Sequence, residues 1–248
     1  AYSSSCAHMA KVKSAALFGL DCTLVEVEAD IASGLPNFTI VGLPDAAVKE
    51  SRERVRAAIK NSGLAFPQTR ITVNLAPADV KKEGPSYDLP IAMSILIGEG
   101  LLPQNPPALK DALLVGELAL DGTLRRIAGA LSMALEARER GVKRIFLPPG
   151  NAAEAGAVDN LEIIPVPSLI ALVEYLTDRA PLEPWHSTSP GDVEKPTYPV
   201  DFAHIRGQQS AKRALTVAAA GGHNVLMAGP PGAGKTLLAR ALPSILPE

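Results

Sequence analysis

Val225-Leu-Met-Ala-Gly-Pro-Pro-Gly-Ala-Gly-Lys-Thr236 is the stretch of sequence that decides the fold of the C-terminal part of this chain. Its first four residues form a short apolar run that predicts a buried strand, and Leu237–Leu242 predicts a helix. Between them, residues 229–236 match the pattern GxxxxGK[ST] in the strand–loop–helix context that a P-loop requires. A glycine-rich turn that matches by chance is the alternative, and the flanking elements argue against it.

The chemistry of this loop is that of a triphosphate-binding site. Glycines allow backbone N–H groups to converge on phosphate oxygens at the start of a helix. Lys235 would reach the β- and γ-phosphates, and the Thr236 hydroxyl would hold Mg²⁺. The predicted cofactors are ATP and Mg²⁺, and the predicted nucleotide-binding residues are Gly229, Pro230, Pro231, Gly232, Ala233, Gly234, Lys235 and Thr236.

A P-loop ATPase also needs an acidic residue on a later strand, which holds Mg²⁺ and orients the attacking water. The short stretch between Thr236 and Glu248 does not supply such a strand. We therefore expect the chain to be a fragment of a longer protein. We also expect this fragment to contain no complete catalytic site and not to hydrolyse ATP unaided.

Composition limits the remaining classes of function. Hydrophobic residues make up 47% of the 248 residues, so a sizeable core can form. The 24 Lys and Arg residues against 26 Asp and Glu give a net charge of -2, which excludes a globally basic nucleic-acid coat. No apolar run approaches the roughly 18–20 residues of a membrane span, and we expect a soluble protein. Cys6 and Cys22 are too few for a disulfide framework or a Cys-based zinc site, and suit a reducing cytoplasm.

Residue types divide the chain into four segments. Residues 1–8 are polar and unpatterned and run into His8-Met9, a junction typical of an expression tag. Residues 9–177 alternate between strand and helix patterns. Residues 178–200 contain five prolines, which predict an extended linker. Residues 201–248 form a second, shorter unit that contains the P-loop.

Residues 9–177 predict an α/β domain. Alternation of apolar and polar residues predicts strands over Cys22–Asp30, Arg70–Leu75, Asn37–Gly42 and Arg144–Leu147. Helical spacing predicts helices from Pro44 to Ser62 and over Leu89–Ile97, Ala128–Arg140 and Leu169–Leu176. Strands that alternate with helices indicate the α/β fold class.

Several longer motifs resemble a known family. They are Val41-Gly-Leu-Pro-Asp45, Glu50–Arg56, Arg70–Asp79 and Asp88–Ile91 in the first unit, and Asp201–Gln208, Gly222–Leu226 and the P-loop in the second. Together they resemble the ComM/YifB family, in which an N-terminal Lon-protease-like domain precedes a magnesium-chelatase-type AAA+ ATPase domain. The resemblance implies a Lon-like α/β domain over 9–177 and the start of a P-loop AAA+ domain over 201–248.

The resemblance also implies a function. It implies an ATP-driven motor that forms a hexameric ring at full length and acts in the cytoplasm, without a membrane partner. Its substrate would be branched or single-stranded DNA, because the family is associated with a helicase that promotes branch migration in natural transformation. A chelatase-like ATPase that remodels a protein partner is the alternative, since a P-loop serves either substrate. In the AAA+ pattern, Ile205 and Gly207 lie where such modules line the adenine pocket, although ordinary core packing explains them equally well.

Lys82-Glu-Gly-Pro-Ser86 is similar to the Lon motif in which a serine after Gly-Pro is the nucleophile. A serine hydroxyl needs an adjacent base, and Lon enzymes supply a lysine. The companion motif, which is Gly116-Glu117 followed by Gly129-Ala130, places Leu131 at the position of that lysine. Leucine cannot accept a proton. A Ser86 peptidase is therefore the least favoured function, and we expect the first domain to be a non-proteolytic scaffold.

Four basic side chains share one face of the helix predicted from Pro44 to Ser62. They are Lys49, Arg52, Arg56 and Lys60, at spacings of 3, 4 and 4. Like charges at i and i+4 repel by a few tenths of a kcal/mol, and contact with nucleic-acid phosphates would relieve that repulsion. Contact with an acidic protein surface, or a solvated face partly neutralised by Glu50 and Glu53, explains the same pattern. No aromatic residues interleave these charges, so a base-stacking platform is not indicated.

Overall fold

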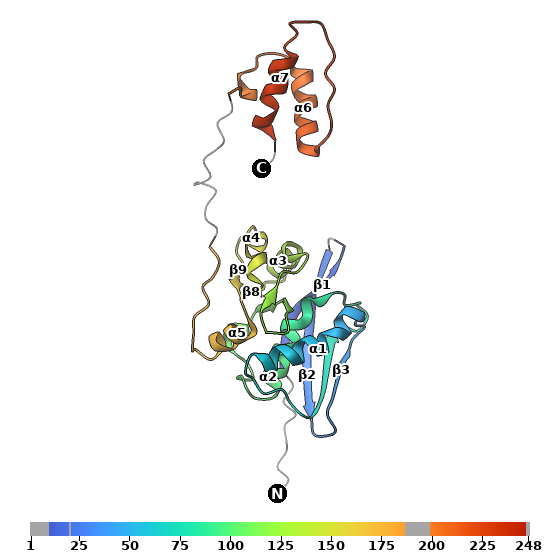
Figure 1. The fold of residues 1–248 in the computed structure, drawn as a ribbon, viewed down its shortest axis with the longest axis vertical. Helices are drawn as coiled ribbons and strands as arrows, with labels where there is room; N and C mark the ends of the chain where they lie inside the picture. The colour runs from blue at the N-terminus through green and yellow to red at the C-terminus, as the bar shows by residue number, and fades with distance from the viewer. Residues whose placement is uncertain (1–9, 20, 187–198, 247–248) are drawn as a thin grey trace. The chain divides into compact units, whose positions relative to one another are not determined.

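The computed structural model describes residues 10–19, 21–186 and 199–246. The chain divides into two compact units, residues 1–187 and 188–248 (Figure 1). The predicted tag and residues 187–198 of the predicted linker lie outside the described residues. Within the described ranges, no helix has the length and apolar character needed to cross a bilayer.

A seven-stranded mixed sheet forms the centre of the first unit, in the order β3-β4-β2-β1-β5-β8-β9. β1 is antiparallel to β2 and β2 to β4, whereas the other neighbouring strands are parallel. A separate antiparallel ribbon is formed by β6 (Glu117–Leu118) and β7 (Leu124–Arg125). The strands of the main sheet are β1 (Ala10–Phe18), β2 (Asp21–Ala32), β3 (Asn37–Val41), β4 (Arg70–Ala76), β5 (Ala112–Leu114), β8 (Arg144–Leu147) and β9 (Glu162–Pro165).

Helices cover both faces of the sheet (Figure 1). On one face lie α1 (Ala46–Asn61), α2 (Asp88–Gly98) and α5 (Leu169–Leu176), and on the other lie α3 (Ala130–Glu139) and α4 (Ala152–Ala155). Within β5, Leu114 packs in the first core and Leu113 in the second. Burial on both faces is typical of parallel strands in α/β proteins. The α/β fold class predicted from the sequence is confirmed.

The strand and helix predictions in the first unit are confirmed to within two residues. In β4, the residues Ile71, Val73 and Leu75 are buried and alternate with more exposed ones, as a half-buried strand requires. In α1, Asp45 caps the N-terminus by accepting a hydrogen bond from the backbone N–H of Val48 at 2.7 Å. The strands β1, β5 and β9 were not predicted.

The structure explains two residues of the motif Val41-Gly-Leu-Pro-Asp45, which are Gly42 and Asp45. Gly42 has a φ of 99°, and a Cβ added there would lie 2.1 Å from the carbonyl oxygen of Leu75 in β4. Only glycine fits so close to the neighbouring backbone. Asp45 then joins the start of α1 to the loop before α2, because its second carboxylate oxygen accepts a hydrogen bond from the N–H of Gly84 at 3.2 Å.

A buried carboxylate at the start of α2 joins three elements. Asp88 is fully buried, and its oxygens accept hydrogen bonds from Arg54 Nε at 2.7 Å, Arg54 Nη2 at 3.1 Å and the N–H of Leu118 at 3.1 Å. Arg54 lies on α1 and also donates to Ser51 Oγ at 3.1 Å. Burial raises the pKa of the Asp88 carboxyl, and the hydrogen bonds from Arg54 oppose that shift. The two-pronged contact therefore fixes α1, α2 and β6 against one another.

The second unit contains the helices α6 (Gln209–Gly221) and α7 (Lys235–Ala241). Short 3-10 turns, η5 (Phe202–His204) and η6 (Leu242–Ile245), precede and follow them. Its small core is formed by Ile205, Leu215, Leu238 and Ala241. The helix predicted over Leu237–Leu242 is confirmed as α7, which begins two residues earlier, whereas α6 was not predicted.

The prediction of a buried strand over Val225–Ala228 is wrong. These residues form no strand, and Leu226 is 94% exposed. A strand is stable only when a neighbouring strand accepts and donates its backbone hydrogen bonds. The described residues of the second unit include no other strand that could pair with this segment.

We expect Arg54→Met to lower the free energy of unfolding by about 3 kcal/mol near neutral pH, because it leaves the buried Asp88 charge without its cation. In the variant, burial raises the folded-state pKa of Asp88 above its unfolded value with little opposition. Protonation then favours the folded state, so the deficit should shrink as pH falls through that raised pKa. Urea denaturation at neutral and mildly acidic pH measures this, with the exposed Lys49→Met on the same helix as control. An Arg54→Met deficit that is independent of pH would contradict the assignment.

Candidate functional site

The P-loop is an exposed loop that leads into α7. Gly232 and Gly234 have φ values of 80° and 82°, and a Cβ at either position would meet nothing within 4 Å. Backbone conformation, rather than crowding, therefore favours glycine there. Lys235 Nζ donates hydrogen bonds to the carbonyl oxygens of Gly229 at 2.7 Å and Pro230 at 2.8 Å. Lys235 therefore holds the start of the loop through hydrogen bonds to its backbone.

A cavity of about 360 Å³ lies beside this loop. The P-loop contributes Gly229, Pro230, Ala233 and Lys235 to its wall, and α6 and residues 225–228 contribute mostly apolar side chains. Gln208 also lines the cavity, and its Nε2 donates to the carbonyl oxygen of Ala233 at 3.3 Å. Sequence reasoning did not single out Gln208, although it is the last residue of the Asp201–Gln208 motif.

The two residues predicted to lie near adenine occupy different environments. Ile205 is buried in the core of the second unit with Leu215 and Leu238, and it does not line the cavity. Gly207 is exposed and has a φ of 72°. Core packing accounts for Ile205, and a contact of either residue with adenine stays a prediction.

The residues of the loop fit a triphosphate with its magnesium ion. The loop is exposed, has a lysine at the start of α7, and is followed by the exposed hydroxyl-bearing Thr236. No group of three or more His, Cys, Asp or Glu that could hold a metal occurs in the part of the chain that the structure describes. A magnesium ion that enters with a triphosphate would contact Thr236 together with phosphate oxygens and water, ligands that Mg²⁺ accepts.

Ser86 lies in the one-turn helix η1 (Pro85–Tyr87) immediately before α2. It is 7% exposed, and its carbonyl oxygen accepts a hydrogen bond from the N–H of Gly116 at 2.9 Å. A cavity of about 310 Å³ adjoins it, and the charged residues in its wall are Glu83, Glu117 and Arg126. None of these is a lysine or a histidine, and an arginine stays protonated at any useful pH.

No lysine or histidine lines the cavity beside Ser86 in the part of the chain that the structure describes. Leu131, at the predicted position of the Lon lysine, is 39% exposed and does not line this cavity, which instead contains Ala128 and Met133. Lys82 is buried outside the cavity and its Nζ donates to the carbonyl oxygen of Pro77. That burial lowers the pKa of Lys82. Its described side-chain hydrogen bond is to Pro77 and not to Ser86.

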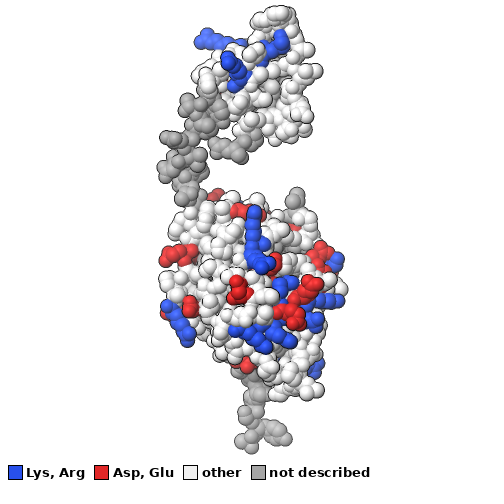
Figure 2. Space-filling model, viewed as in Figure 1, with Lys and Arg blue, Asp and Glu red and all other residues white. Residues whose placement is uncertain are grey.

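The four basic residues on α1 do not form one uniform surface. Lys49 and Lys60 are exposed, while Arg52 is held by the carbonyl oxygens of Lys49 at 3.1 Å and Phe38 at 3.3 Å. Arg56 lies over the ring of Phe66, with its guanidinium carbon 5.4 Å from the ring centroid. On the face of the first unit drawn in Figure 2, basic and acidic side chains are interspersed. Arg56 and Lys60 both line one small cavity, whereas Lys49 and Arg52 do not.

The fold and the loop define an α/β protein with a separate P-loop unit. The family described as "Subunit ChlI of Mg-chelatase" matches residues 27–151, and the family described as "Magnesium chelatase, subunit ChlI" matches residues 201–248. The chain belongs to this Mg-chelatase ChlI family.

Individual proteins similar to this chain extend the comparison. The chain is 44% identical over 240 residues to YifB of Salmonella typhimurium, covering 96% of this chain and 46% of the relative. It is 42% identical over 244 residues to the competence protein ComM of Haemophilus influenzae, covering 97% and 47%. The Lon protease of Brucella suis is 25% identical over 187 residues, covering 70% of this chain and 22% of the relative. The chain thus spans about half the length of the YifB and ComM relatives, and the predicted resemblance to their family is confirmed.

We expect the chain to show no serine peptidase activity, because the cavity beside Ser86 contains neither the lysine of a Lon-type dyad nor a histidine. A fluorophosphonate probe should not label the folded protein, and Ser86→Ala should leave nucleotide binding unchanged. Trypsin, labelled in parallel, confirms that the probe is reactive. Labelling of the wild-type chain that disappears in Ser86→Ala would show an activated serine and contradict this expectation.

Proposed function

We propose that the protein is an ATP-dependent AAA+ motor that acts on DNA, as a helicase that promotes branch migration. The observation that carries the proposal is the P-loop of a Mg-chelatase ChlI family unit, in which Lys235 and Thr236 stand at the start of α7. Bound ATP with Mg²⁺ would supply the free energy that drives movement. The residues that hold it are the loop amides, Lys235 for the β- and γ-phosphates, and Thr236 for the magnesium ion.

Lys235 is the residue whose contacts would change on binding. Its ammonium group now bonds to the carbonyl oxygens of Gly229 and Pro230. A triphosphate offers this ammonium group charged acceptors, which form stronger hydrogen bonds than neutral carbonyls do. The exchange would free the loop to turn its amides toward phosphate oxygens.

The first unit serves in this proposal as a non-proteolytic scaffold. Its weaker likeness to Lon proteases supports a shared fold, while the described lining of the cavity beside Ser86 includes no lysine or histidine. Folds are often retained while the chemistry of a site is lost. The charges Lys49, Arg52, Arg56 and Lys60 on α1 are the proposed contacts to nucleic acid, and a hexameric ring in the cytoplasm is the proposed assembly.

DNA as the substrate is supported by the likeness to a protein named for competence, ComM. A second candidate is an ATPase that remodels a protein partner, which the family description favours because ChlI is a subunit of Mg-chelatase. ATPase stimulation separates the two candidates. Branched DNA should stimulate the protein at the length of its relatives if DNA is the substrate, and DNA of any structure should have no effect if a protein is.

We expect Lys235→Ala to abolish Mg²⁺-ATP binding, because it removes the charge that faces the β- and γ-phosphates. Binding of a fluorescent ATP analogue to this chain, with and without Mg²⁺, measures the effect. Lys212→Ala, a lysine on α6 of the same unit that does not line the P-loop cavity, serves as control. Unchanged binding in Lys235→Ala would contradict the assignment of the loop.

We expect neutralisation of the α1 charges to weaken DNA binding equally for unrelated sequences. Each lost phosphate contact should reduce the slope of log affinity against log salt by about one unit. The triple variant Lys49→Gln, Arg52→Gln and Lys60→Gln is measured by fluorescence anisotropy with duplex and branched DNA over a range of salt. An unchanged slope would assign this helix face to solvent or to a protein partner.

A further inference from the structure

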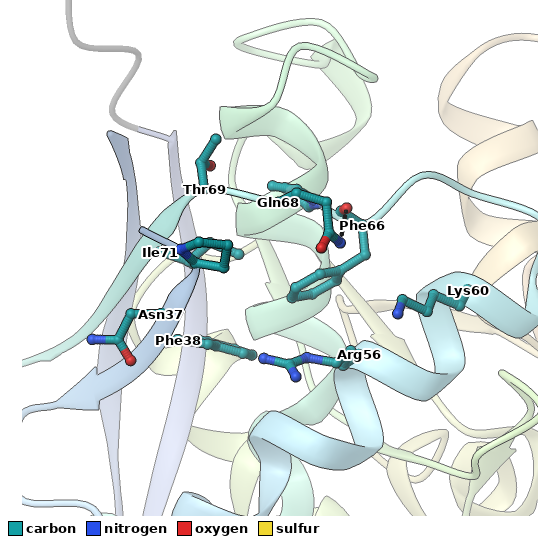
Figure 3. A pocket seen from close by; sticks show the side chains of 10 residues that line it. Asn37, Phe38, Arg56, Lys60, Phe66, Gln68, Thr69 and Ile71 are labelled. Carbon is teal, nitrogen blue, oxygen red and sulfur yellow. Dashed lines mark hydrogen bonds between the residues drawn. The ribbon is translucent and has the colours of Figure 1, made fainter. Parts of the chain in front are cut away.

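We propose that a small cavity beside Arg56 and Lys60 in the first unit is a binding site for a phosphate group. Figure 3 shows this cavity between α1, the start of β3 and the segment 66–71. Its volume is about 70 Å³. A cavity needs about 10–15 Å³ of such space to hold one water molecule, so this one admits a compact oxyanion.

The cavity has a rigid floor and an open mouth. Phe38, Phe66 and Ile71 are buried beneath it, and the two aromatic rings pack at a centroid distance of 6.0 Å. Asn37, Lys60 and Gln68 at its rim are exposed. A buried apolar floor holds the polar groups in place, and the exposed rim lets a ligand enter from solvent.

Two polar atoms in the wall are buried without a hydrogen-bond partner in the described structure. They are Arg56 Nε and Thr69 Oγ1, and both residues line the cavity. An unsatisfied buried donor costs about 1–3 kcal/mol, and more when it is charged. Each such atom in a folded protein needs an explanation, which is local strain, a functional role or an absent water or ion. Both atoms are closed to solvent in this structure, so an oxyanion in the cavity would accept hydrogen bonds from them only after their side chains turn toward it.

The charged side chains that line the cavity favour a negatively charged ligand. Arg56 and Lys60 both line the cavity, and no Asp or Glu does. Neither cation forms an ion pair with any residue that the structure describes. Stacking on Phe66 holds the guanidinium group of Arg56 in one orientation, which leaves its N–H groups pre-organised for an anion. The proposal for this cavity depends neither on nucleotide binding at the P-loop nor on DNA as the substrate.

The Arg56 Nε–H resonance in the ¹H–¹⁵N spectrum of the whole chain tests the proposal at the site itself. Its assignment comes from its loss in Arg56→Lys. Inorganic phosphate should shift this resonance in a saturable way, and chloride at the same ionic strength should not. Because the readout is local, phosphate bound at the P-loop does not interfere with it.

Lys60→Gln should weaken phosphate binding about tenfold, since a hydrogen bond to a charged group contributes this much to affinity. Lys60 is exposed, so the fold should be retained, and Lys49→Gln makes the same charge change on α1 outside the cavity. Thr69→Val, which keeps the side-chain shape, should also weaken binding.

Duplex DNA, titrated in the same way, distinguishes the two sources of phosphate. A shift of the Arg56 resonance by both DNA and inorganic phosphate would identify a contact with the nucleic-acid backbone, and a shift by inorganic phosphate alone would identify a site for a free anion. Either result supports the proposal. A resonance that phosphate does not move, or moves equally in the wild type and Lys60→Gln, would show that the cavity holds only water and would overturn it.

Discussion

A carboxylate that is fully removed from water must keep its hydrogen-bond partners, and this constraint at Asp88 organises the first unit. Its partners come from α1, through Arg54, and from β6, through the N–H of Leu118. Asp45 adds a second link, because it caps α1 and also binds the N–H of Gly84. The loop that carries Ser86 lies between these two carboxylates and is fixed by both.

This arrangement gives the Lon-like motif a structural reason for its residues. Gly84 has a φ of 80°, and its N–H meets Asp45 while the carbonyl oxygen of Ser86 meets Gly116. The backbone of the motif therefore joins α1, α2 and the segment before β6. None of these contacts uses the hydroxyl group of Ser86 as a nucleophile. The motif thus has a packing role that does not depend on any catalytic role of Ser86.

The sequence predicted those elements whose pattern is local. β2 and β4 alternate because one of their faces is half exposed, and α1 carries its own N-cap in Asp45. β5 is only three residues long and buried on both faces, so no alternation marks it. Val225–Ala228 resembles such a strand in composition, but pairing depends on a partner elsewhere in the chain, and composition does not reveal that partner. Its apolar side chains line the cavity of the second unit instead.

The two proposed anion-binding sites differ in how their residues are brought together. The residues of the P-loop are contiguous in sequence. Its Lys235 already donates hydrogen bonds to carbonyl oxygens of the loop, so a ligand must replace these hydrogen bonds. The cavity beside Arg56 is assembled from the start of β3, α1 and residues 66–71, which no motif connects. There the ring of Phe66 holds the guanidinium group, and the polar atoms Arg56 Nε and Thr69 Oγ1 are left without a described partner. A ligand at the P-loop must replace hydrogen bonds that the loop already makes, whereas a ligand in the cavity would meet two cations that form no ion pair with any described residue. Cations without a competing partner lower the free-energy cost of binding an anion.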